Sequence, residues 1–97
     1  MRSVHLSDLN LAARTLMVAP HAQRAAMMET LLVRAQTADK YRKKTGRAHA
    51  RYGNGSLGAA CQDWPKAPMP DRCDSDYLMC LRAVVQALIT VGSHQSV

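Results

Sequence analysis

The stretch "HAQRAAMMETLLVRAQTADKYRKKT", residues 21–45, decides the fold, because it is the longest segment of the chain without proline or glycine. Pro20 suits the first position of a helix, and Gly46 can adopt the left-handed conformation that ends one. We therefore predict one long central helix over residues 21–45, about 37 Å in length. Apolar side chains recur through it at helical spacing and form a stripe: Ala25, Met28, Leu31, Leu32, Ala35 and Ala38.

A first helix precedes the long one. Ser7 is a favourable N-cap for it, and apolar residues recur at helical spacing after Ser7. Because proline disfavours helical conformation in the residue before it, this helix should end near Val18, ahead of Ala19 and Pro20. The first helix and the long helix should then form an N-terminal helical hairpin.

Two further helices are predicted downstream. Ser56 can cap a short helix that runs through Cys61. Asp74 or Ser75 can cap a C-terminal helix with a clear apolar face, which should end at Gly92.

The segment 62–74 contains three prolines and predicts an extended connector. Trp64 should pack this connector against the helices. The less favoured alternative is that the PxxP spacing from Pro65 to Pro68 makes the segment a ligand for a peptide-binding domain. The polar residues 93–97 predict a frayed tail. Together these elements predict an all-α fold, a small helical bundle that forms a single domain over residues 1–97.

The composition indicates a globular protein, with 47% apolar and 21% charged residues in a chain of 97. Three irregularly spaced cysteines favour reduced thiols and not a disulfide framework. No secretory signal and no stretch long enough to cross a membrane is evident. We therefore expect a cytoplasmic protein that does not associate with membranes.

The net charge of +6 is concentrated in one short segment. Residues 40–51 hold six cations and no acid, and the remaining seven cations equal the seven acids. Clustered cations can neutralise phosphates, and nearby aromatic rings can stack on bases. The sequence therefore predicts an anion-binding or nucleic-acid-binding site with possible base stacking by Tyr41 and Tyr52. Its cations are Lys40, Arg42, Lys43, Lys44, Arg47 and Arg51.

Two other interpretations compete for this region. Cations at a helix C-terminus also interact favourably with the helix dipole, although six without an acid exceed what that requires. The adjoining "GNGSLG", residues 53–58, has the G-x-G-x-x-G spacing of dinucleotide-binding loops, but those loops follow a β-strand. Here a cationic helix end precedes the glycines, which favours a turn.

No catalytic or metal site is predicted. The gaps between Cys61, Cys73 and Cys80 fit no familiar zinc spacing, and the histidines are scattered. No histidine is placed beside a thiol as a cysteine nucleophile would need. We expect a protein that is not an enzyme and needs no cofactor.

Three stretches resemble the small terminase subunit of phage-like DNA-packaging systems, including those of gene transfer agents: "VHLSDLNLAAR", "ADKYRKKTGRAHARYGNGS" and "DYLMCLRAVVQAL". The resemblance covers most of the chain. It implies a non-catalytic homo-oligomer, typically a ring, that engages DNA and works with a large ATPase-nuclease subunit. Many small terminases begin with a helix-turn-helix domain, and this chain shows no convincing one. The resemblance therefore implies DNA binding that is weak, nonspecific or shared with a partner.

Two functions follow from the sequence. The favoured one is a DNA-packaging accessory protein that contacts DNA through the basic helix end. The alternative is a small helical adaptor without a nucleic-acid role, whose apolar faces or tail dock another protein while its cations meet acids on that partner. The long helix and the Ala/Met-rich faces favour self-association in either case.

Overall fold

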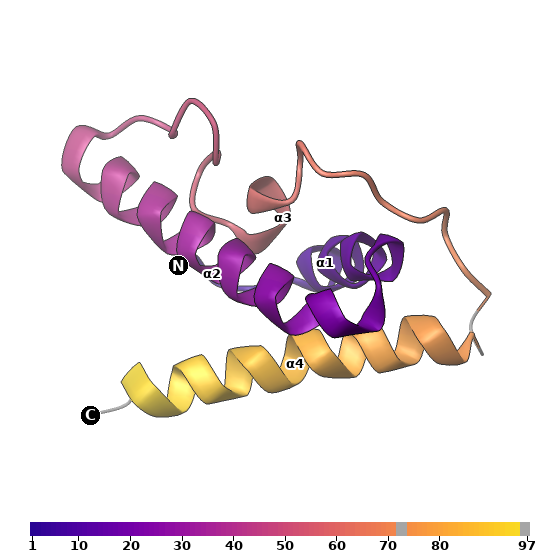
Figure 1. Ribbon diagram of the computed structural model, residues 1–97. Coiled ribbons are helices and arrows are strands. Elements are labelled where there is room, and N and C mark those ends of the chain that lie inside the picture. The colour runs from indigo at the N-terminus through magenta and orange to yellow at the C-terminus, as the bar shows by residue number, and fades with distance from the viewer. Residues whose placement is uncertain (72–73, 96–97) are drawn as a thin grey trace.

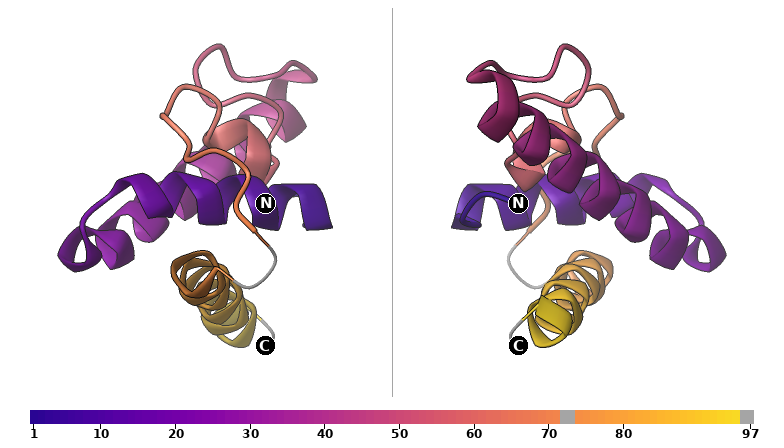
Figure 2. Two further views of the ribbon diagram at one scale, coloured as in Figure 1. Left: turned by 90° about the vertical axis from the view of Figure 1, so that its right-hand side faces the viewer. Right: turned by 90° about the vertical axis from the view of Figure 1, so that its left-hand side faces the viewer.

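The computed structural model describes residues 1–71 and 74–95, which form four helices and no β-strand (Figure 1). The helices are α1 (Leu6–Val18), α2 (His21–Thr45), α3 (Leu57–Ala60) and α4 (Ser75–Gln95). The predicted all-α class and the order of one long, one short and one C-terminal helix are confirmed. Figure 2 shows α4 as a separate layer that α1 crosses steeply, and α4 packs mainly against α1.

The turn between α1 and α2 forms where the proline predicted it. Ala19 is extended, with φ −90° and ψ 149°, and α2 begins directly after Pro20. At the other end of α2, Gly46 has φ +74° and its N–H donates to the carbonyl of Arg42 at 2.7 Å. Both ends of the long helix are therefore set by local backbone chemistry.

The start of α1 differs from the prediction. The helix begins at Leu6 with His5 as its N-cap, so Ser7 lies in the first turn and does not cap it. Asp8 is the reason, because its Oδ2 accepts from the backbone N–H of His5 at 3.0 Å. Its Oδ1 accepts from the backbone N–H of Gly58 at 3.1 Å, so this buried carboxylate joins the start of α1 to α3.

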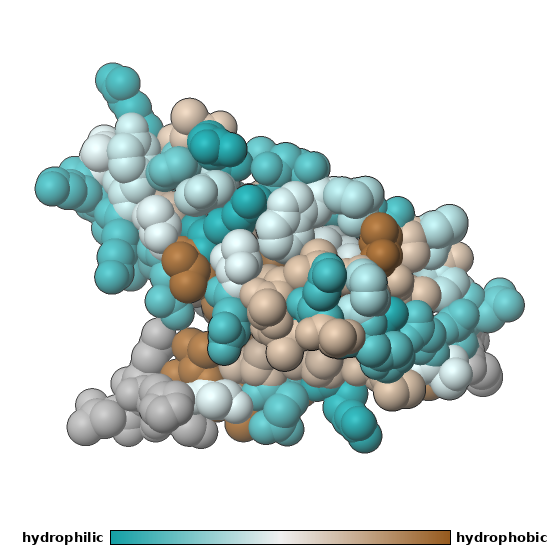
Figure 3. Space-filling model, viewed as in Figure 1, coloured by the Kyte–Doolittle hydropathy of each residue, from teal (hydrophilic) through white to brown (hydrophobic). Residues whose placement is uncertain are grey.

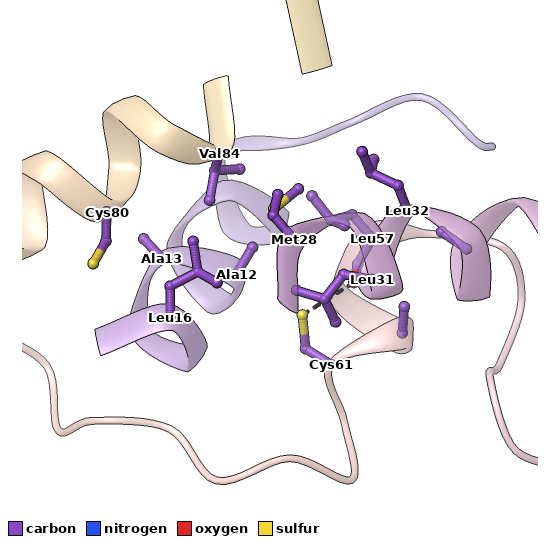
Figure 4. Close-up of a cluster of buried hydrophobic side chains, with 12 residues drawn as sticks. Ala12, Ala13, Leu16, Met28, Leu31, Leu32, Leu57, Cys61, Cys80 and Val84 are labelled. Carbon is purple, nitrogen blue, oxygen red and sulfur yellow. Dashed lines mark hydrogen bonds between the residues drawn. The ribbon is translucent and has the colours of Figure 1, made fainter. Parts of the chain in front are cut away.

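All four helices contribute to one core (Figure 4). Leu16, Leu31, Leu57 and Val84 are fully buried and come from α1, α2, α3 and α4 in turn. Two free cysteines, Cys61 and Cys80, are also buried in this core.

The N-terminal end of α4 is fixed to the other helices by polar contacts. Asp74 caps it, because its Oδ1 accepts from the backbone N–H of Tyr77 at 2.9 Å. The hydroxyl of Tyr77 donates to Oδ1 of Asn10 on α1 at 2.9 Å. Arg24 on α2 donates to both carboxylate oxygens of Asp76, at 2.7 and 3.2 Å.

The described part of the predicted connector contains no helix and is tied to α1. Arg14 donates through Nε to the carbonyl of Ala67 at 2.8 Å, and the N–H of Ala67 donates back to the Arg14 carbonyl at 3.0 Å. Trp64 packs against the core, as predicted. Arg72 and Cys73 lie outside the described residues.

The predicted end of the last helix at Gly92 is wrong, because α4 continues to Gln95. A glycine inside a helix costs about 1 kcal/mol relative to alanine but does not by itself end the helix. The chain has no proline after Pro70 that would force an end. Of the predicted tail, residues 93–95 belong to α4, and Ser96 and Val97 lie outside the described residues.

We expect Asp8→Ala to lower the free energy of unfolding by about 2 kcal/mol, because it leaves the buried N–H of Gly58 without an acceptor. Urea unfolding followed by circular dichroism measures this change. The control is Asp71→Ala, which removes an exposed carboxylate and should change the free energy by less than about 0.5 kcal/mol. Equal effects of the two substitutions would contradict the role given to Asp8.

Candidate nucleic-acid interface

The predicted cations gather at the C-terminal end of α2 and in the loop that follows it. Figure 1 shows this end projecting away from α4, and Figure 3 shows hydrophilic side chains over it. Five of the six predicted cations are exposed there, and we call them the basic tip: Lys40, Lys43, Lys44, Arg47 and Arg51.

The cations do not all lie on one helix face. In the sequence, Lys40, Lys43, Lys44 and Arg47 have the i, i+3, i+4 and i+7 spacing that predicts one face of a helix. For Arg47 this prediction is wrong. The helix ends at Thr45, and the left-handed Gly46 turns the chain, so Arg47 lies in the loop. The basic tip therefore combines a helix end with a loop.

A buried acid lies directly beneath the basic tip. Asp39 has a side chain only 3% exposed, and its carboxylate lies 3.0 Å from both Arg42 Nη2 and Lys43 Nζ. The amino group of Met1 lies 3.1 Å from the same carboxylate. The role of Asp39 was not predicted from the sequence, because the run of cations begins after it at Lys40. The i, i+3 and i, i+4 spacing from Asp39 to Arg42 and Lys43 was the available signal.

The contacts around Asp39 hold the pKa of its carboxyl well below its usual range. The hydrogen bond from Lys43 has the largest effect, followed by those from the N-terminal amino group and from Arg42. Burial opposes them by raising the pKa, but it is outweighed. The carboxylate therefore stays ionised throughout the neutral pH range.

Arg42 joins α2 to the following loop. Besides its contact with Asp39, it donates through Nε to the carbonyl of Asn54 at 3.1 Å. Next to this bond, the backbone of Gly55 packs directly on Asp39, since a Cβ at Gly55 would lie 2.8 Å from the Asp39 Cα. Arg42 thus has a positioning role, and it is the predicted site residue least available to an external anion.

Apart from Arg42 and Lys43, which contact Asp39, four of the predicted cations remain. Within the described ranges 1–71 and 74–95, none of them has an acidic ion-pair partner. With Asp39 counted against the six cations, residues 39–51 carry a net charge of +5. The part of that charge that is open to a ligand is supplied by Lys40, Lys44, Arg47 and Arg51.

The loop that carries Arg51 is a tight turn. His49 and Gly53 exchange two backbone hydrogen bonds, of 2.8 and 3.0 Å, and Gly53 has φ +80°. The imidazole Nδ1 of His49 accepts from the backbone N–H groups of Arg51 and Tyr52, each at 3.1 Å. Because α2 precedes this turn, the glycine-rich segment lacks the strand that a dinucleotide-binding loop follows.

The two predicted stacking residues flank this same imidazole. The ring of Tyr52 is stacked on His49 with centroids 4.7 Å apart, and Tyr41 meets His49 edge-on at 5.3 Å. The Arg34 guanidinium also lies over Tyr52, 5.0 Å from the ring centroid. Tyr52 is thus already engaged by two neighbours, whereas Tyr41 is exposed and has the freer ring. Base stacking by either residue stays a prediction.

Other chemistry has little support in the described part of the chain. No three His, Cys, Asp or Glu side chains come together there as potential metal ligands. Burial raises the pKa of the Cys61 and Cys80 thiols, which disfavours the reactive thiolate. No helix in this part combines the length and the apolar character that a membrane span requires.

The lowered pKa of Asp39 predicts acid sensitivity. An unfolded aspartate has a pKa of about 3.9, so below about pH 4 the unfolded chain binds a proton that the folded chain does not take up. Stability from this group is therefore fully present above about pH 4 and is lost as the pH falls toward the folded pKa. As the pH falls from 7 to 3, the free energy of unfolding measured with urea should decrease less in Asp39→Asn than in the original chain. An identical pH dependence would contradict this role.

Two glycines of the region provide a matched pair of substitutions. Gly46→Ala should lower the free energy of unfolding by roughly 1–2 kcal/mol, which is the penalty of an alanine in the left-handed conformation. No steric clash adds to this penalty, because nothing lies within 4 Å of the added methyl group. Gly55→Ala should cost clearly more, since it has φ +95° and its Cβ would meet the backbone of Asp39. Thermal and urea unfolding of the two variants check this order, and a reversed order would contradict the close packing.

Comparison with known proteins gives one relationship. No curated protein and no solved structure matches the chain significantly. A family described as a domain of unknown function, DUF7742, matches residues 2–88, which include all of the basic tip and most of α4. The chain therefore belongs to the DUF7742 family.

Proposed function

We propose that this protein is a non-catalytic accessory protein that contacts the phosphate backbone of duplex DNA through its basic tip. The observation that carries the proposal is a cluster of four exposed cations at the projecting end of α2 and in the loop after it, which have no acidic partner among the described residues. Phosphate contacts need cations that are concentrated on one surface and free to approach the ligand. Within the basic tip, Lys40, Lys44, Arg47 and Arg51 meet both conditions.

The arrangement favours weak and nonspecific binding. Lysines at a helix end and arginines in a loop can reach phosphates, and phosphate contacts carry no direct sequence information. If the four cations without a described acidic partner all contact phosphates, log K should fall with log[salt] with a slope of about −3.6. Such a module positions a protein on DNA but does not select a site.

The biological role that we propose is DNA packaging in the cytoplasm, in the manner of a small terminase subunit. It rests on the resemblance of the three sequence stretches to that family. The protein would act as a homo-oligomer that brings DNA to a large terminase-like motor subunit. In an oligomer several weak tips act on one duplex, which raises the overall affinity without any new contact.

A second candidate is a protein-interaction adaptor without a nucleic-acid role. It is favoured by an apolar groove of about 450 Å³ between α2 and α4. The lining of the groove includes Met28 and Leu32 from α2, and Ala87 and Val91 from α4. In this case the basic tip would meet acidic side chains of a protein partner.

Fluorescence anisotropy with a labelled 25-base-pair duplex at 50 and 200 mM salt separates the two functions. We expect measurable affinity at 50 mM that falls steeply at 200 mM. Lys44→Gln should weaken binding several-fold and make the salt slope less negative by about 0.9, the effect of one phosphate contact.

The matched control is Gln23→Glu, an exposed position at the opposite end of the same helix. Both substitutions lower the net charge by one, but only Lys44→Gln alters the basic tip. Absence of binding at 50 mM salt would overturn DNA contact and favour the adaptor. Equal losses in both variants would show a general charge effect and would overturn the assignment to the tip.

A further inference from the structure

Helix α4 carries a second group of apolar side chains, which stay exposed in the part of the chain that the structure describes. Cys80 and Val84 point into the core and are essentially inaccessible to solvent. Four large apolar side chains on other parts of the helix are well exposed: Leu78 by 47%, Met79 by 47%, Val85 by 38% and Ile89 by 56%. Because α4 forms an outer layer of the molecule, this second face is open to another chain (Figure 2).

Three of these four side chains follow a regular spacing, and Met79 lies beside them. Leu78, Val85 and Ile89 share one side of α4 with the exposed Arg82, and we call these residues the outer stripe: Leu78, Arg82, Val85 and Ile89. The steps between them are four, three and four residues, which is the alternating a and d spacing of two coiled-coil heptads. A stripe with this spacing is suited to contact one other helix along its length.

The outer stripe is complementary to itself in one orientation. Its spacing is the same when it is read in either direction along the helix. In an antiparallel pair of α4 helices, Leu78 therefore lies opposite Ile89 of the partner subunit. Arg82 lies opposite Val85 of the partner subunit.

Charge selects this orientation over the parallel one. A parallel pair would place Arg82 against Arg82 of the partner subunit, and like charges directly opposite each other destabilise a helix pair. An antiparallel pair places the aliphatic part of Arg82 on a valine and lets the guanidinium reach water. Antiparallel helix dipoles add a small favourable contribution.

We propose that α4 is a self-association surface through which two copies of this chain pair in antiparallel orientation. The contact covers only two heptads and is smaller than the roughly 800 Å² per partner of a standard interface. The dimer is therefore weak and dissociates on dilution. This pairing does not rest on the proposed DNA binding, because the outer stripe and the basic tip have no residue in common.

Sedimentation equilibrium over 10 µM to 1 mM protein tests the pairing. The weight-average mass should rise with concentration from the 10.7 kDa of one chain toward twice that value. Val85→Glu should keep the chain monomeric. The matched control is Val33→Glu, because Val33 is 63% exposed on α2, and this variant should associate like the original chain. Monomers throughout, or equal effects of the two substitutions, would overturn the proposal.

Disulfide trapping tests whether the two α4 helices are antiparallel. It introduces no charge into the contact, so it does not depend on whether Val85→Glu folds. Cys73 is replaced by serine throughout, and Cys61 and Cys80 are buried. A mixture of Arg82→Cys and Val85→Cys chains should form the mixed disulfide several-fold faster than either variant forms a disulfide with itself. Preferential self-linkage of Arg82→Cys would show a parallel pair and overturn the antiparallel arrangement. Absence of any trapped dimer would overturn the proposal that α4 is a self-association surface.

Discussion

The buried carboxylate of Asp39 is the interaction on which the functional end of the molecule depends. It brings together the last turns of α2, the N-terminal residue and, through the close approach of Gly55, the loop after the helix. Burial of this carboxylate would be costly without its three cationic partners, because burial of an unpaired charge is unfavourable. The cations that lie closest to the interior therefore pair with Asp39, whereas the outermost cations of the basic tip remain exposed to solvent.

The ends of the long helix could be predicted because they depend on residues beside them. Pro20 restricts Ala19, and Gly46 supplies a left-handed residue without steric cost. The start of α1 could not be predicted in the same way. Asp8 is held by Gly58, which is distant in sequence, and no local pattern reveals such a partner. The end of α4 was predicted wrongly at Gly92, because a glycine permits a helix to end but does not require it.

The location of the candidate site could also be predicted, but the separate tasks of its residues could not. Lys44 and Arg42 look equivalent in the sequence, as cations two residues apart in one basic run. Their difference depends on the path of the loop, which brings the carbonyl of Asn54 to Arg42 and leaves Lys44 exposed. The placement of His49 between two tyrosines likewise requires the turn at Gly53.

The packing of Gly55 against α2 has a consequence for how this family can diverge. The backbone of one segment touches the backbone of another there, so evolution cannot enlarge position 55 without moving the loop and the cations it carries. Gly46 faces open space, and asparagine, which tolerates the left-handed conformation, is an accessible replacement. We therefore expect a relative that keeps this loop to keep a glycine at position 55 beside the residue at position 39, even where its surface charges differ.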